Sequence, residues 1–139
     1  MSEFSGYFRH PQPGSLLLRL EGAALLLAAL TVFWQLGGNW WIFLLLCLAP
    51  DLSFFALAAG PRAGAMVYNA VHTSAAPLLV AALAWLGGAP WLIPFMAIWL
   101  AHIGADRMLG YGLKYPDRVE QTHLGPIGKA AKDDAAKAT

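Results

Sequence analysis

The sequence predicts an all-α integral membrane protein of four antiparallel transmembrane helices with both termini in the cytoplasm. The 139-residue chain is 58% hydrophobic but only 12% charged, whereas an ordinary soluble domain has about 25% charged residues. Asp, Glu, Lys and Arg are absent from residues 22–50, 52–61 and 63–105, and a membrane-spanning helix needs about 20 mainly apolar residues. Breaks rich in Gly and Pro divide these stretches into four segments.

The first two segments follow a polar N-terminal region, residues 1–15, which we expect to lie in the cytoplasm. A helix is predicted over Leu16–Leu36 and ends at a Gly-Gly-Asn break. A second helix is predicted over Trp40–Ala59 and ends at a Gly-Pro pair. Pro50 lies inside the second helix and removes one backbone hydrogen bond, so we expect the helix to be loosened there.

The last two segments predict helices over Ala63–Leu86 and Trp91–Leu109, with Pro77 loosening the third helix one turn beyond His72. The connections are short, so each helix should run antiparallel to the one before it. Residues 16–110 would then form a four-helix transmembrane bundle, and residues 111–139 a cytoplasmic C-terminal tail.

The orientation follows from the basic residues beside the predicted spans. The connections after the first and third helices contain no Lys or Arg, and short basic flanks remain in the cytoplasm. The basic flanks contain Arg9, Arg19, Arg62, Arg107, Lys114 and Arg118. Tryptophans gather at the opposite ends of the helices, where the headgroup layer favours indole rings. They are Trp34, Trp40, Trp41, Trp85 and Trp91.

The remaining composition gives little indication of a macromolecular partner. The net charge of +1 gives no support for nucleic acid as a partner. The lipid bilayer is the expected environment. The small size and minimal loops are also typical of a subunit of a homo-oligomer or of a larger membrane complex.

Ionisable residues inside the predicted spans are costly in lipid and indicate function. At 1.5 Å per residue, Asp51 and His72 should lie roughly 15 Å from the cytoplasmic edge, and His102 about 10 Å. Glu21 and Asp106 should be shallower. All of them fall in the cytoplasmic half, and a helix bundle turns its polar groups inward. We therefore expect one inward-facing polar cluster open to the cytoplasm.

The sharpest hypothesis for this cluster is a metal site. Asp51, His72, His102 and Asp106 offer two imidazoles and two carboxylates, a set that suits Zn, Mn or Fe. His102 and Asp106 are four residues apart and share a helix face. A metal-bound water has a pKa near 7 and would be the nucleophile of a hydrolase. The substrate would be a phospholipid or another amphiphile.

Two more residues receive roles in this hypothesis, and two alternatives stay open. Glu21 would be a general base or a further ligand, and Arg107 would orient an anionic substrate. In the first alternative the cluster is a structural network in a non-catalytic subunit or assembly factor, with ion pairs such as Asp106–Arg62. In the second, His72 and His102 are axial haem ligands, which the nearby carboxylates disfavour.

Five runs of the sequence resemble a family of small bacterial membrane proteins of unknown function. The resemblance covers about residues 15–129 and implies an inner-membrane, multi-pass protein without implying an activity. The runs are Leu48–Ser53, Tyr68–Thr73, Ala101–Arg107, Gly110–Pro116 and Thr122–Gly125.

The sequence also resembles, more loosely, predicted metal-dependent hydrolases of the bacterial inner membrane, some described as LexA-binding. Those proteins carry a Pro-Asp pair, then a His-containing helix, then His-x-x-x-Asp before a Gly…Pro segment. Here the same order is formed by Pro50-Asp51, His72, and His102 with Asp106. Ser53 stands where those proteins usually have a second acidic residue. This resemblance implies a metal site more strongly than it implies a reaction.

Overall fold

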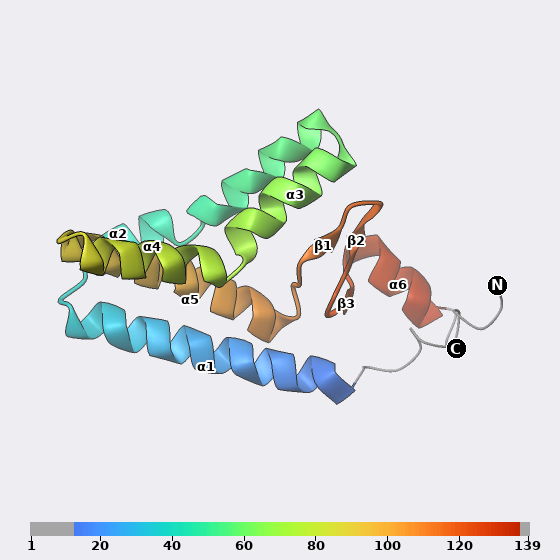
Figure 1. The fold of residues 1–139 in the computed structure, drawn as a ribbon. Helices are drawn as coiled ribbons and strands as arrows, with labels where there is room; N and C mark the ends of the chain where they lie inside the picture. The colour runs from blue at the N-terminus through green and yellow to red at the C-terminus, as the bar shows by residue number, and fades with distance from the viewer. Residues whose placement is uncertain (1–12, 137–139) are drawn as a thin grey trace.

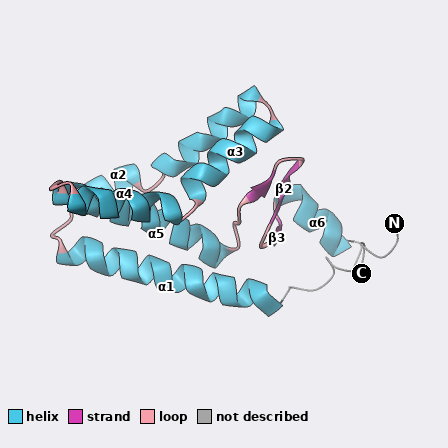
Figure 2. Cartoon of the chain, viewed as in Figure 1, coloured by secondary structure: helices cyan, strands magenta, loops and turns pink. Residues whose placement is uncertain are grey.

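The computed structural model describes residues 13–136, which form a mostly helical chain (Figures 1 and 2). Most of the predicted segment 1–15, including Arg9, lies outside the described residues. The helices are α1 (Pro13–Gln35), α2 (Trp40–Leu46), the 3-10 helix η2 (Ala49–Ala59), α3 (Pro61–His72), α4 (Ala75–Leu86), the 3-10 turn η3 (Pro90–Leu92), α5 (Ile93–Leu109) and α6 (Gly128–Ala136). The strands are β1 (Lys114–Tyr115), β2 (Arg118–Thr122) and β3 (Gly125–Pro126).

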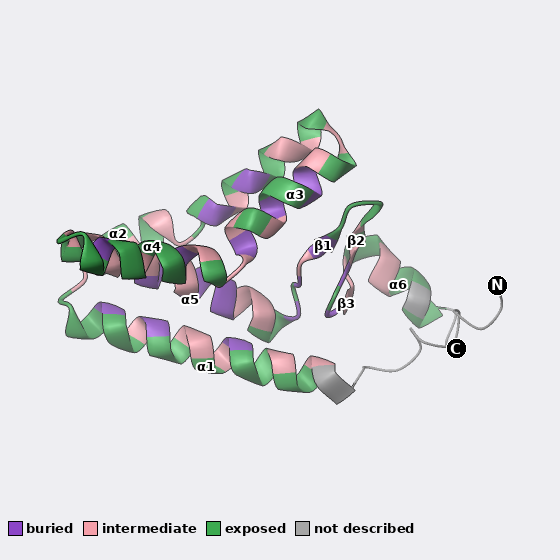
Figure 3. Cartoon of the chain, viewed as in Figure 1, coloured by how far each residue is buried: buried purple, intermediate pink, exposed green. Residues whose placement is uncertain are grey.

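Three helical segments within residues 13–136 are long and apolar enough to cross a membrane. They are Ser15–Gln35, Trp40–Ala59 and Pro90–Leu109. α3 and α4 reach that length only together and are bent by 48°, so they supply a fourth span if the pair counts as one. Large apolar side chains such as Trp41, Leu45 and Leu86 are exposed, as lipid-facing residues must be. Figure 3 shows that much of α4 is exposed.

Proline explains where the predicted second and third helices are interrupted. The prediction placed one helix over Ala63–Leu86, but the structure ends α3 at His72 and begins α4 at Ala75. Pro77 lacks an N–H, and its ring would clash with the carbonyl of Thr73 in a continuous helix. In the same way Pro50 cannot donate to Leu46, where α2 ends before the 3-10 turns of η2.

α1 packs lengthwise against α5 through small residues. A Cβ on Gly104 of α5 would lie 2.6 Å from the backbone nitrogen of Leu26 and 2.8 Å from the carbonyl oxygen of Gly22, both in α1. Only glycine allows this approach, which is typical of helix pairs in membranes. Near the other end of the pair, Phe33 of α1 packs against Ala97 and Ile98 of α5 in a buried cluster.

η2 and α3 form a helical hairpin that projects away from the α1–α5 pair (Figure 1). Gly60 turns the chain between them with a φ of 110°, a conformation that other residues avoid. The two arms pack closely, because a Cβ on Gly64 would lie 2.7 Å from Cγ of Leu57. The hairpin meets the α1–α5 pair where η2, α3 and α5 come together.

The described part of the predicted C-terminal tail contains strands and a helix. β1, β2 and β3 form a three-stranded antiparallel sheet in that order, and α6 follows it. In Figure 1 this sheet lies between α3 and the end of α5. The all-α prediction is therefore too simple: the chain is mostly helical, with a small sheet beside the point where the helices converge.

Candidate metal centre

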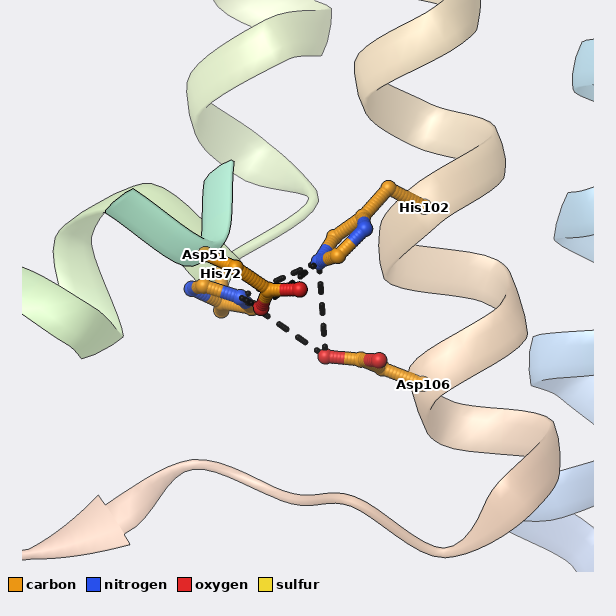
Figure 4. Close-up of side chains that lie close together, drawn as sticks. All are labelled: Asp51, His72, His102 and Asp106. Carbon is orange, nitrogen blue, oxygen red and sulfur yellow. Dashed lines mark hydrogen bonds and ion pairs between the residues drawn. The ribbon is translucent and has the colours of Figure 1, made fainter. Parts of the chain in front are cut away.

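Four predicted site residues come together from three separate elements (Figure 4). Asp51 lies in the first turn of η2, and His72 is the last residue of α3. His102 and Asp106 are one turn apart on α5. Pro50 and Pro77 interrupt the helices beside Asp51 and His72. As a result the start of η2 and the end of α3 both lie next to one face of α5.

The polar atoms of the four side chains converge on one point. Nε2 of His72 and Nε2 of His102 are 3.2 Å apart. From Nε2 of His72, the nearest oxygens of Asp51 and Asp106 are each at 3.6 Å. From Nε2 of His102 they are at 3.5 Å and 3.7 Å. Within the described chain, one atom from each residue can be chosen so that all four lie within 4.8 Å of one another.

These separations match the edges of a small coordination tetrahedron. Imidazole nitrogens and carboxylate oxygens lie about 2.0–2.2 Å from zinc, and a regular tetrahedron of that radius has edges of about 3.3–3.6 Å. The five distances involving a histidine run from 3.2 to 3.7 Å. The group could therefore hold a metal ion without a large movement of any side chain.

His72 is oriented by a backbone carbonyl. Its Nδ1 lies 3.0 Å from the carbonyl oxygen of Tyr68, and a carbonyl only accepts, so Nδ1 carries the proton. Nε2 of neutral His72 is then left with a free lone pair that faces the cluster. A second hydrogen bond of this kind is usual for metal-binding histidines. The Tyr68 ring also stacks on the imidazole at 3.8 Å between centroids.

Burial is uneven around the group. The side chain of His72 is fully buried, and those of His102 and Asp106 are 7% and 18% exposed. Asp51 is the accessible member, with 40% of its side chain exposed. Water or a substrate can therefore approach on the Asp51 side, while the histidine side is enclosed by protein.

The structure does not bring the two predicted catalytic residues into this group. Glu21 is exposed on α1 and is not one of the four clustered residues. Arg107 donates to the carbonyl oxygen of His72 at 2.7 Å and to that of Tyr111 at 2.8 Å. It thereby ties the end of α3 to the chain that leaves α5.

The ion pair expected between Asp106 and Arg62 is not formed. Arg62 lies 3.8 Å from Asp117 instead, and both side chains are more than four-fifths exposed. The reason is positional: Arg62 begins α3 at the far end of the hairpin, whereas Asp106 lies beside the last residue of the same helix.

Two residues beside the group received no role in the metal hypothesis. The Asn69 carboxamide accepts from the backbone N–H of Lys114 at 2.7 Å and donates to its carbonyl oxygen at 2.8 Å. The pairing of Asn69 with a strand has no signal in the sequence. Lys114 served only as a basic flank in the prediction, and the structure buries it.

Burial lowers the pKa of the Lys114 ammonium below its ordinary value, and the charges of Asp106 and Asp51 oppose this effect. Partial burial also lowers the pKa of His123, and the charge of Arg107 acts in the same direction. The Lys114 ammonium in β1 thus interacts electrostatically with both carboxylates of the group.

The fold and the site define a mostly helical protein with several candidate membrane spans and a buried Asp/His group that could hold a metal ion. The chain belongs to the family DUF4260, a domain of unknown function, whose model matches residues 15–127. This range lies close to the one over which the sequence resembled an uncharacterised family. No curated protein matches the chain, and no solved structure does.

Proposed function

We propose that this protein is a membrane-embedded, metal-dependent hydrolase that acts on a lipid or another amphiphile. The observation that carries the proposal is the convergence of Asp51, His72, His102 and Asp106 at tetrahedral spacing. Metal sites are among the few reasons to gather two carboxylates and two imidazoles within membrane spans, because isolated ionisable groups are costly there.

The exposure of the four side chains indicates how tightly each would bind the metal ion. His72, His102 and Asp106 form the enclosed part of the centre and would hold a divalent ion such as Zn, Mn or Fe. Asp51, the most exposed of the four, lies where water enters and would bind more loosely, leaving a position for water or substrate. A metal in such a site supplies a nucleophile by lowering the pKa of bound water to about 7.

An apolar cavity supports an amphiphile as the substrate. It has a volume of about 320 Å³, which is within the range of small-molecule sites. Pro50 and Val71, which directly precede two of the proposed ligands, are part of its wall. An alkyl chain held there would bring its polar end toward the centre. The full lining is Leu46, Ala49, Pro50, Val71, Phe95, Ile98 and Trp99.

The contacts of Arg107 favour a different role from the one expected of it. Its guanidinium is hydrogen-bonded to two carbonyls, so we assign it as a positioning residue that holds His72 and the chain after α5. The exposed Glu21 has no part in the proposed centre.

Elemental analysis of the detergent-purified protein tests the metal site. We expect about one divalent ion per chain, lost from His102→Ala and from Asp106→Asn. A matched control is His123→Asn, which removes a histidine outside the group and should keep the metal. If His102→Ala retains as much metal as the wild type, the proposed function is wrong.

A second candidate is a non-catalytic subunit of a larger membrane complex. The two Nε2 atoms at 3.2 Å are already within hydrogen-bond distance, so the group can also serve as a structural network. Purification at fixed stoichiometry with other proteins, together with the absence of metal, would favour this role.

The geometry argues against haem. The Nε2 atoms of His72 and His102 are 3.2 Å apart, a separation that suits two ligands of one small metal ion, with carboxylates of Asp51 and Asp106 beside them.

A further inference from the structure

Lys114 is a buried cation beside the proposed centre. Only 6% of its surface is exposed, and burying an ammonium is costly unless it has a partner. Its Nζ lies 4.4 Å from the centre of the Tyr68 ring and 5.1 Å from that of Phe54. The faces of aromatic rings attract a cation. Within residues 13–136 this ammonium contacts the two rings but forms no hydrogen bond or ion pair.

The backbone holds Lys114 in this position. Asn69 pairs with both its N–H and its C=O, as a neighbouring strand would. The Tyr68 ring that Nζ approaches is the ring that stacks on His72. In Figure 4 the chain leaving α5 passes beside the four clustered side chains on its way to β1. The Tyr68 ring thus contacts both the Lys114 ammonium and the imidazole of His72, a proposed ligand.

The ammonium is not fully enclosed although the residue is buried. In the described part of the chain, Ser53 Oγ is the only fully enclosed side-chain polar atom without a hydrogen-bond partner. Nζ of Lys114 has no such partner either, so a small part of its surface is exposed. An anionic ligand could supply the hydrogen bonds that the protein does not.

Charge indicates what that ligand is. Asp51 and Asp106 together balance a divalent ion, and Arg107 is bonded to backbone carbonyls. Without an ion these two carboxylates favour the charge of Lys114, but with a divalent ion bound Lys114 would be a positive charge that no carboxylate of the centre balances. We propose that Lys114 binds the phosphate group of the substrate, which would be an anionic phosphate-bearing amphiphile. This inference deepens the proposed function and rests on it.

Equilibrium titration of the full-length, metal-loaded protein in neutral detergent tests the role of Lys114. The probes are short-chain phosphatidic acid, the corresponding diacylglycerol without phosphate, and inorganic phosphate. In Lys114→Met we expect the Kd for phosphatidic acid to rise about tenfold or more, since a hydrogen bond to a charged group is lost. Metal content and diacylglycerol binding should not change.

A matched control removes the same charge elsewhere. Lys129 is exposed on α6, so Lys129→Met should bind phosphatidic acid as the wild type does. If Lys114→Met also binds like the wild type, the inference is wrong even when the metal is present. If inorganic phosphate binds as tightly as the lipid and depends on Lys114 in the same way, the ligand of the site is free phosphate and not a phosphate-bearing amphiphile.

Two further measurements separate the possible failures. Repeating the titration on metal-free protein separates them: the effect of Lys114 should shrink there, because Asp51 and Asp106 then balance its charge, whereas a wild type that never holds metal contradicts the hydrolase and this inference together. If Lys114→Met does not fold, acetic anhydride labelling of the wild type replaces it. Saturating phosphatidic acid should then slow acetylation of Lys114 several-fold but not that of Lys129, and equal rates would overturn the inference.

Discussion

Single side chains at the centre are oriented by backbone groups of neighbouring residues. The carbonyl of Tyr68 holds the proton of His72 on Nδ1, which turns Nε2 toward the other ligands. The Asn69 carboxamide holds both backbone groups of Lys114. The Asn69 contacts replace hydrogen bonds that a neighbouring strand would supply, so losing this side chain leaves backbone groups of the buried Lys114 unpaired at a cost of about 1–3 kcal/mol.

His123 gives a prediction at this scale. The N–H of Leu113 donates to its Nδ1 at 2.9 Å, so this nitrogen must be unprotonated. Because the pKa of His123 is lowered in the folded state, the unfolded chain binds a proton more readily. Stability from this residue should therefore be present above the unfolded pKa of about 6.5 and decrease as the pH falls below it.

Thermal unfolding from pH 8 to pH 5 checks this, with His123→Asn as the comparison. The Asn side chain can accept from Leu113 but does not titrate. The wild type should lose more of its stability than the variant as the pH falls. Parallel curves for the two proteins would show that His123 does not contribute.

Among the elements, the α1–α5 pair determines whether the centre can form. His102 and Asp106 lie on either side of Gly104, and Gly104 meets backbone atoms of α1. Packing against α1 therefore helps to hold the helix that carries two proposed ligands. This packing leaves no space for a side chain at Gly104, because the nearest atoms of α1 belong to the backbone and cannot move aside.

Gly104→Val is expected to force α1 and α5 apart and to destabilise the protein by about 1–3 kcal/mol, as overpacking does. It should also weaken metal binding, since His102 and Asp106 would move with α5. Ala82→Val is a suitable control because Ala82 is exposed on α4. Unfolding temperatures in detergent and metal content would be measured together. Wild-type values for Gly104→Val would contradict the close packing.

On the scale of the whole molecule, four spans would put both ends of the chain on one side of the membrane. We propose that this side is the cytoplasm and that the membrane is the inner membrane of a bacterium, because the basic residues flank these ends. The small sheet and Lys114 would then meet substrate from the cytoplasmic leaflet.

Cysteine labelling of intact cells tests this orientation. Starting from Cys47→Ala, a cysteine at Gln35, next to the first connection, should react with a membrane-impermeant maleimide. A cysteine at Lys132 in α6 should react only after the cells are permeabilised. The reverse pattern would place the sheet and the metal centre toward the outside.

Much of the fold could be predicted from the sequence because the membrane imposes simple rules on it. Apolar length and Gly/Pro breaks placed the helical segments within a few residues of α1, of α2 with η2, and of η3 with α5. The positions of Pro50 and Pro77 inside predicted helices indicated that they would disturb those helices. Costly ionisable residues inside apolar spans pointed to the four residues that the structure brings together.

The apolar segments, their limits and the residue types available for a site could be predicted from the sequence, since these depend on local chain properties. Which residues meet depends on the folded structure. The packing of Gly104 against α1, the hairpin of η2 and α3, and the pairing of Asn69 with Lys114 join residues far apart in the chain. Helix rotation and strand pairing depend on such long-range contacts. For this reason Glu21 lies outside the centre, and Lys114, which appeared to be a simple basic flank, lies beside it.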